Sequence, residues 1–429
     1  MSVFRPVAAD RTRLINPFRV MDVLERARQL ELAGADIVHL EVGEPDFATA
    51  PQIVAAGVKA LELGHTAYTP AAGLPALRER IAGFYADHHG VTVDPSRILV
   101  TPGASGALVL AANLLLNAGD TVLMPDPSYP CNRNYVHLVG GRAVLLPPVT
   151  PGSPAPTPAQ LDTVYDGSVK GLWLASPANP TGAVIRADEV KTLSDWASTH
   201  DVHLLMDEIY QGLDYLDDPA AGALDGPAAG ALDGAAAGAL NSPAAGASDG
   251  PAAGTMANLP TALGYSPNNL VVNSFSKYFG MTGWRVGWLV VPQALAATAN
   301  ILAQNLFIAA PTPAQHAALR AFDADVTEVL EQRREAFRQR RDFLCDALRS
   351  VGFTLPWQAD GAFYCYAGIE RFADDSEAFC QMLLEKHGVA VTPGTDFGRH
   401  DAHKYVRFAF TNSLPRLELA AERLQLALR

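Results

Sequence analysis

Six short apolar runs recur along the first two thirds of the chain and alternate with stretches long enough for helices. The runs are 97–101, 120–124, 171–175, 203–206, 270–273 and 286–291. None of them alternates apolar with polar residues, which is typical of strands buried on both faces of a sheet. Helix-length stretches such as 105–117 and 187–200 lie between them. This order predicts an α/β fold, with an open and mostly parallel sheet covered by helices on both faces.

The last third of the chain has a different pattern. Residues 325–350 form an amphipathic stretch rich in arginine and glutamate, which predicts a long helix. Three further runs predict strands and a final stretch predicts a terminal helix, namely 361–368, 389–391, 406–410 and 414–428. This mixture predicts a second, smaller α+β unit beside the larger one.

Residues 219–254 repeat a unit of eight residues, PAAGALDG, with small variations. Of these 36 residues, 15 are alanine, 8 glycine and 4 proline, so the segment has little to contribute to a core. The regular glycines and prolines also work against a stable helix. We expect a tolerated insertion in a surface loop, because the entropy of closing a loop grows only slowly with its length. A partner-binding linker is the alternative interpretation.

Charge and cysteine content argue against several classes of protein. The formal net charge of −13 argues against a nucleic-acid binder, but a local basic pocket for a small anion is compatible with it. The four cysteines have no CxxC spacing, which indicates reduced thiols in a cytoplasmic protein and predicts no metal site. The N-terminus has no apolar segment typical of a secretory signal. The uncharged tract 286–319 is interrupted by three prolines, so it predicts a buried strand and an interface helix, not a membrane span.

The segment 273–287, NSFSKYFGMTGWRVG, is the most informative part of the sequence. Lys277 follows directly after a predicted buried strand, with two serines just before it and Arg285 eight residues later. A lysine in a dry pocket has a lowered pKa and can form a Schiff base with an aldehyde. Hydroxyl groups and a guanidinium nearby suit a phosphate group. A lysine at a strand end is usually an ordinary surface residue, but this clustering favours a binding site.

Other candidate ligand groups also follow predicted strands. In TPGASGAL, Ser105 and the backbone N–H groups at the start of a helix form a potential anion site. Asp207 of DEIY can hold a proton on a heterocyclic nitrogen, with a helix cap as the alternative. Asn179 of SPANPTG offers an amide, and Tyr129 can stack on a flat ring or serve only in packing. Together these groups suit one ligand, a planar phosphorylated aldehyde with a ring nitrogen, namely pyridoxal phosphate.

With these motifs in order, the sequence resembles the class I/II aminotransferases, pyridoxal-phosphate enzymes of fold type I. The most specific motif is SFSKYFGMTGWRVGW, supported in order by EVGEPDF, YTPAAGLPALR, SPANPTG, DEIY, GAFY, VTPGTDFG and YVRFAF. The resemblance implies a large domain with a mostly parallel seven-stranded sheet and a smaller α+β domain. It places the N-terminal arm and part of the small domain at 1–47, the large cofactor-binding domain at 48–302 and the C-terminal small domain at 303–429.

The resemblance also implies a role for each matching residue. Lys277 is expected to form the Schiff base and then to act as general base, and Asp207 to pair with the pyridinium nitrogen. Asn179 and Tyr210 are expected to bind the ring oxygen, and Tyr129 to stack on the ring. The competing carboxylate beside Asp207 is taken as structural. The implied phosphate ligands are the Ala104 backbone N–H, Ser105, Ser274 and Arg285.

The remaining implied contacts concern the substrate and a second subunit. Arg407 is expected to bind the α-carboxylate of the substrate, with Asn179 and the Gly43 backbone beside it. Arg407 could instead be a strand-edge arginine, but a buried arginine requires an anionic partner. Tyr68 is expected to reach the phosphate of the neighbouring subunit, which implies a homodimer. No motif of this sequence matches the second cation that aspartate-specific relatives use for a distal substrate carboxylate. Arg133 is the candidate, and a solvent-facing arginine is the alternative.

The implied function is transfer of the amino group of an L-amino acid to a 2-oxo acid by a ping-pong sequence. A β-eliminating C–S lyase on the same fold is the main alternative, because it needs the same lysine, aspartate and arginine. A third hypothesis is a sensor that binds cofactor and ligand without catalysis. Such proteins carry an N-terminal DNA-binding domain, and no helix-turn-helix pattern is visible in this sequence.

Overall fold

The structure is a computed structural model that describes residues 6–150, 152–216 and 259–429. The repeat at 219–254, which we interpret as a loop insertion, lies outside the described residues. Among the described helices, none combines the length and the apolar composition needed to cross a membrane.

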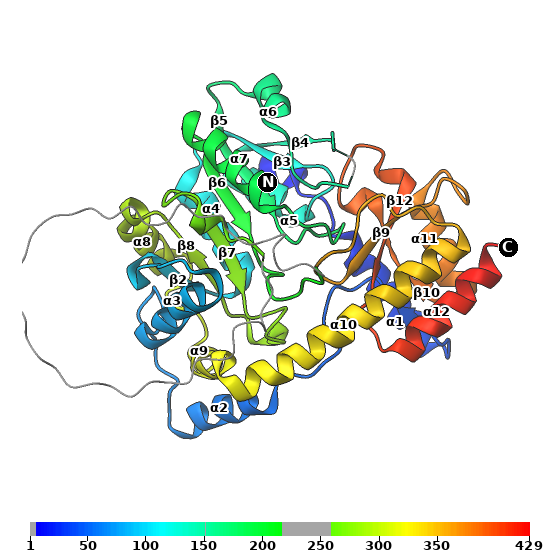
Figure 1. Ribbon diagram of the computed structural model, residues 1–429, viewed down its shortest axis with the longest axis horizontal. Coiled ribbons are helices and arrows are strands. Elements are labelled where there is room, and N and C mark those ends of the chain that lie inside the picture. The colour runs from blue at the N-terminus through cyan, green and yellow to red at the C-terminus, as the bar shows by residue number, and fades with distance from the viewer. Residues whose placement is uncertain (1–5, 151, 217–258) are drawn as a thin grey trace, which may run out of the picture.

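A seven-stranded sheet forms the centre of the larger part of the molecule (Figure 1). Its strands, in spatial order, are β2 (Ile98–Thr101), β8 (Gly287–Val290), β7 (Leu270–Ser274), β6 (His203–Asp207), β5 (Val169–Ala175), β3 (Thr121–Pro125) and β4 (Arg142–Leu146). Only β8 runs antiparallel to its neighbours, and the other pairings are parallel. The predicted fold class is therefore confirmed.

All six apolar runs of the sequence form strands of this sheet, and the edge strand β4 is the one that they do not predict. Both β2 and β4 lie at an edge of the sheet, but β2 is buried throughout, whereas the first four residues of β4 are exposed or half-buried. Strand β4 therefore lacks the continuous apolar character of a strand that is buried on both faces.

Helices cover both faces of the sheet. Those that contact its strands are α3 (Pro75–His89), α4 (Gly103–Leu115), α5 (Pro130–Leu138), α7 (Ala187–Thr199) and α8 (Ala296–Leu306). The remaining helices, α2 (Pro51–Glu62), α6 (Pro158–Val164) and α9 (Thr312–Ala318), pack on other helices. Helix α4 packs on β7, β8 and α8, and together they enclose one apolar cluster that includes Trp173. A second and larger cluster lies on the other face of the sheet and continues into the C-terminal part of the chain.

The smaller part is built from the C-terminal third together with the N-terminal segment. Its helices are α1 (Arg19–Leu32), α10 (Ala324–Val351), α11 (Ser376–His387) and α12 (Leu414–Ala427). A three-stranded antiparallel sheet has the order β11 (Thr392–Pro393), β12 (Tyr405–Ala409), β9 (Tyr364–Gly368). The short β1 (Val38–His39) pairs in parallel with β10 (Val389–Ala390). In Figure 1 the long helix α10 runs from the side of α9 to that of α12.

The N-terminal segment therefore belongs structurally with the end of the chain, because β1 pairs with β10 and α1 packs on β10 and β11. The boundaries at 48 and 303 stay a prediction. The uncharged tract 286–319 forms β8, α8 and α9, and the interface helix expected in it stays a prediction.

Candidate active site

Side chains from the carboxyl ends of β5 and β6, and from the segment after β7, meet residues of the small part around one cavity of about 240 Å³. Ligands of open α/β sheets bind at this edge. Ten of the twelve predicted site residues line the cavity: Gly43, Ala104, Ser105, Tyr129, Asn179, Asp207, Tyr210, Lys277, Arg285 and Arg407. Ser274 and Tyr68 are not among the residues that line it.

Lys277 places its amine in this cavity, three residues beyond the end of β7. Its Nζ donates a hydrogen bond to the carbonyl oxygen of Gly43 at 2.7 Å. Burial lowers the pKa of Lys277 to about 8, against the opposing charge of Glu44, and the positive charge of Arg407 adds to the lowering. The neutral form of the amine, which a nucleophile or a base requires, is therefore far more populated near neutral pH than in an ordinary lysine.

Asp207 ends β6 and is buried at the cavity. Its carboxylate accepts the backbone N–H of Ile209 at 3.2 Å. Burial raises the pKa of Asp207 to about 7, and the Ile209 N–H and the Lys277 charge only partly offset this. A cation bound next to this carboxylate would lower its pKa and keep it ionised.

The neighbouring Glu208 is oriented differently. Its carboxylate accepts hydrogen bonds from the Thr261 hydroxyl at 3.0 and 3.1 Å and from the Ala262 backbone N–H at 2.8 Å. It does not line the cavity. Consecutive side chains at a strand end project to opposite sides, so one carboxylate faces the cavity and the other the protein interior.

A candidate anion-binding region lies at the start of α4. Arg285 has a left-handed backbone (φ 55°) and lies next to Gly103, where an added Cβ would be 2.5 Å from the guanidinium Nη2. A Cβ on Gly287 would similarly lie 2.8 Å from the backbone nitrogen of Ala104. The two glycines thus let a guanidinium and a helix N-terminus approach one another, an arrangement that suits a phosphate group.

Ser274 does not line the cavity, but it contacts a residue that does. Its hydroxyl donates to Ser276 Oγ at 2.9 Å and lies 3.1 Å from the Val286 carbonyl oxygen. Ser276 does line the cavity. The predicted set of phosphate ligands omitted Ser276, although the Ser-x-Ser-Lys pattern contains it.

Arg407 lies in the middle of β12 and is only 2% exposed. Its Nη1 donates to Asn179 Oδ1 at 2.9 Å, and its Nη2 donates to the carbonyl oxygen of Glu41. The guanidinium carbon lies 4.3 Å from the centre of the Tyr364 ring. Nε is buried and has no hydrogen-bond partner among the described residues. Arg407 is therefore a buried cation with neutral hydrogen-bond partners and an unused donor.

Several lining residues carried no predicted role. Tyr364, from the GAFY motif, has its hydroxyl 2.8 Å from that of Tyr210. Tyr364 also explains why residue 43 is a glycine, because an added Cβ there would lie 1.8 Å from the Tyr364 hydroxyl. Phe18, Val20 and Met21, at the start of α1, form an apolar wall. No motif marks these three positions, because their place depends on how α1 packs.

Two residues with predicted roles, Arg133 and Tyr68, lie outside the lining of the cavity. Arg133 is not solvent-facing, as the alternative interpretation had it: it is 7% exposed and donates to the backbone carbonyls of Asp396 at 2.8 Å and Phe397 at 3.4 Å. It does not line the cavity either, so its candidate role toward a distal carboxylate has no support here. Tyr68 is 81% exposed in the single chain.

Comparison with known proteins agrees with this geometry. A family model described as "Aminotransferase class I and II" matches residues 35–424. The chain is 35% identical to a valine–pyruvate aminotransferase of Mycobacterium tuberculosis, over 96% of both chains. It is 32% identical to an aspartate aminotransferase of Geobacillus stearothermophilus, over 97% of both chains. The crystal structure of an aminotransferase from Mycobacterium tuberculosis superposes with a TM-score of 0.86 at 34% identity, covering 99% of both chains.

Proposed function

The chain belongs to the class I and II aminotransferases, and on that premise we propose that it moves the amino group of a neutral L-amino acid to a 2-oxo acid, with pyridoxal phosphate bound beside Lys277. The similar proteins named above are aminotransferases, so neither the lyase alternative nor the sensor hypothesis gains support. The observation that carries the proposal is that one cavity holds a buried amine, a buried carboxylate and a buried guanidinium with an unused donor.

The residues present fit the cofactor. When bound, pyridoxal phosphate supplies an aldehyde that condenses with amines and a ring that accepts an electron pair. Lys277 offers the amine and Asp207 the carboxylate for the ring nitrogen. Tyr129 borders the cavity where it can contact the ring, and Tyr210 and Asn179 offer polar groups for the ring oxygen. The phosphate ligands that we propose are the Ala104 N–H, Ser105, Ser276 and Arg285, with Ser274 supporting Ser276.

The protein's own groups then bind the substrate and move its proton. Arg407 holds the α-carboxylate, using donors such as the free Nε, while the amide of Asn179 fixes the guanidinium. The neutral amine of Lys277 takes the proton from the substrate Cα, because its lowered pKa makes it a base near neutral pH. Asp207 stays ionised next to a cationic ring, and its negative charge keeps the proton on the ring nitrogen. The amino acid binds first and the 2-oxo acid binds after the first product has left, both through the same carboxylate site, which is a ping-pong sequence.

The lining of the cavity favours a neutral side chain on the substrate. Among the described residues that line it, the only lysine or arginine side chains are those already assigned to cofactor and α-carboxylate, namely Lys277, Arg285 and Arg407. Phe18, Val20 and Met21 offer apolar contact, and Glu44 would repel a second carboxylate. The related aminotransferase from Mycobacterium tuberculosis is named for valine and pyruvate, and both of these molecules lack a second carboxylate.

A screen of amino acids tests the function and the substrate class together. Each amino acid is mixed with the purified, cofactor-loaded protein without a 2-oxo acid, and the visible absorbance of the cofactor is followed. We expect valine, leucine and alanine to convert the absorbance, and aspartate to react about 100-fold more slowly, since its second carboxylate would be desolvated without a partner. If no amino acid changes the spectrum, the function is wrong. If aspartate reacts as fast as valine, only the substrate class is wrong.

We also propose a homodimer in which Tyr68 completes the cofactor site of the second subunit. Tyr68 follows α2, whose outer face exposes apolar side chains. These are Val54, Val58 and Leu61, with Leu63 just beyond the helix. The uncharged tract exposes Ile301, Leu306 and Ile308 as well. Exposed apolar groups of this kind are typical of a surface that a partner covers, and a second copy is the partner that the role of Tyr68 requires.

Replacing Tyr68 with phenylalanine tests this arrangement. Loss of one hydrogen bond to a phosphate is expected to weaken the binding of pyridoxal phosphate about tenfold, measured by titration of the cofactor-free protein. Tyr165→Phe, on the surface of the large part, is the control and should bind normally. Light scattering should give twice the 45.5 kDa mass of one chain. A monomer that binds the cofactor equally well with either residue at 68 would contradict the proposal.

A further inference from the structure

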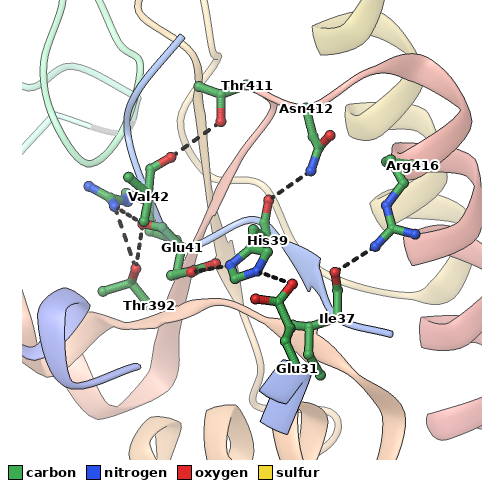
Figure 2. A network of polar contacts seen from close by, with 10 residues as sticks. Glu31, Ile37, His39, Glu41, Val42, Thr392, Thr411, Asn412 and Arg416 are labelled. Atoms are coloured by element: carbon green, nitrogen blue, oxygen red, sulfur yellow. Dashed lines mark hydrogen bonds and ion pairs between the residues drawn. The ribbon is translucent and has the colours of Figure 1, made fainter. Parts of the chain in front are cut away.

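The segment 37–42 links α1 to the cavity and is held along its length by polar groups of the C-terminal part (Figure 2). Its backbone carbonyls accept hydrogen bonds in turn. Figure 2 shows Arg416 bound to Ile37, Asn412 to His39, Thr392 to Glu41 and Thr411 to Val42. The next residue is Gly43, whose carbonyl binds the amine of Lys277. Any shift of this segment therefore reaches the active site.

A charged cluster sits on this segment, separate from the residues that line the cavity. His39 Nδ1 lies 2.7 Å from a carboxylate oxygen of Glu41, and Nε2 lies 3.1 Å from one of Glu31 on α1 (Figure 2). Both ring nitrogens face carboxylates, so both carry a proton. The hydrogen bond to Glu41 is the main reason that the pKa of His39 rises to about 9; burial opposes the rise, and Glu31 adds to it. His39 is therefore an imidazolium at neutral pH.

Glu41 connects this cluster to the substrate site. Its side chain is fully buried, and its second oxygen has no partner among the described residues. The backbone carbonyl of the same residue accepts a hydrogen bond from Arg407 Nη2. A buried carboxylate without a counter-charge is attracted to any cation within its reach, and Arg407, which is bound to the backbone carbonyl of the same residue, is a cation with a free donor, its Nε. His39 supplies the positive charge that satisfies Glu41 instead.

We propose that His39 is a positioning residue, which neutralises Glu41 and so keeps Arg407 available for the carboxylate of the substrate. This inference rests on the proposed function, since it assigns that carboxylate to Arg407. It predicts that loss of the imidazolium weakens substrate binding more than it slows the chemical step. A purely structural role of His39 would instead affect stability, with no dependence on the charge of Glu41.

The decisive experiment compares His39→Gln with the double variant His39→Gln/Glu41→Gln. The single variant leaves Glu41 charged, and we expect the KM for valine to rise about tenfold with kcat changed by less than about threefold. The dissociation constant of isovalerate, a carboxylate that cannot react, should rise equally in calorimetry. The double variant removes the charge, and both constants should return toward wild-type values. His400→Gln, an exposed histidine beside Asp401, is the control.

A comparison at different pH tests the same inference without changing His39. The proton of His39 is bound below the raised pKa and is lost as the pH rises through about 9. The KM of the wild type should therefore rise across that range, and that of Glu41→Gln should rise less. The charged groups facing His39 are Glu31 from α1 and Glu41 from its own segment, with Arg416 of α12 bound to the nearby Ile37 carbonyl. The titration of Lys277 affects KM in both proteins alike, so it does not contribute to the difference between their pH profiles.

Three outcomes would overturn the inference. They are an unchanged KM in His39→Gln, a double variant that binds no better than the single one, and equal pH profiles of wild type and Glu41→Gln. If the single variant does not fold, the pH comparison alone decides. If the wild-type protein converts no amino acid, the proposed function has failed, and that result is read from the amino-acid screen and not from these variants.

Discussion

Replacing Lys277 with alanine is expected to lower kcat/KM by at least about 10⁴-fold, because one substitution removes both the amine that holds the cofactor and the base that moves the proton. The fold should survive. Burial disfavours the charged amine, as its lowered pKa shows, so the variant loses little folding free energy. Unfolding followed by circular dichroism should give a transition temperature at or above that of the wild type.

The covalent role of Lys277 can be measured apart from turnover. Wild-type protein is incubated with pyridoxal phosphate, treated with borohydride and weighed by mass spectrometry, and it should gain one pyridoxyl group, located on Lys277 by peptide mapping. Lys277→Ala should gain none. Lys191→Ala is the matched control, since that lysine is exposed on α7 and pairs only with Asp195 among the described residues. Labelling of Lys277→Ala at wild-type level would contradict the assignment.

The sequence predicts the centre of the fold well because burial dominates there. A strand with neighbours on both sides and helices on both faces needs apolar residues throughout, as in β7, and such a run is visible without any structure. The edge strand β4 has a half-exposed pattern, and no such run marks it. The ligand groups were predictable for a related reason, since parallel strands end at one edge of the sheet and bring Asp207, Asn179 and Lys277 together.

The unpredicted features depend on tertiary packing. The wall formed by Phe18, Val20 and Met21 follows from the docking of α1, whose first two backbone N–H groups lie 3.1 and 3.4 Å from the Asp396 carboxylate. Arg133 appears in the sequence as a helix arginine near a site motif, yet the fold buries it against backbone carbonyls far along the chain. No local pattern encodes either arrangement, because each depends on a partner more than 260 residues away in sequence.

Asp207 and Glu208 show how a local pattern can be ambiguous and the structure decisive. Two adjacent carboxylates in DEIY are equivalent by composition; the first is the candidate because it directly follows a predicted strand, and the resemblance to the aminotransferases assigns it to the ring nitrogen. The structure adds a physical reason. Asp207 faces the cavity with a single backbone N–H bound to it, whereas Glu208 is held by a hydroxyl and a backbone N–H in the interior. The unsatisfied carboxylate is the one available to a ligand.

Asp207→Asn is expected to lower kcat on the order of 10³-fold, because breaking a buried ion pair costs about 3–5 kcal/mol and this pair maintains the charge of the ring. The variant should also bind the cofactor more weakly. Glu208→Gln is the matched control. It removes the adjacent carboxylate but keeps a group that accepts the same hydrogen bonds, so turnover should change by less than about threefold. Both effects are measured by steady-state kinetics with valine and a 2-oxo acid.

Asp207→Asn lowers turnover, but we expect it to raise the stability of the cofactor-free protein. Burial raises the pKa of Asp207 to about 7, above its value in the unfolded chain, so the folded state binds a proton that the unfolded state has already released. Between these two pKa values the wild type therefore loses stability as the pH rises, and the loss is complete above the folded pKa. Asp207→Asn has no such penalty and should unfold at a higher temperature than the wild type at about pH 8. A variant that is less stable at that pH, or that turns over at the wild-type rate, would show that Asp207 is a structural residue and that the ring nitrogen has another partner.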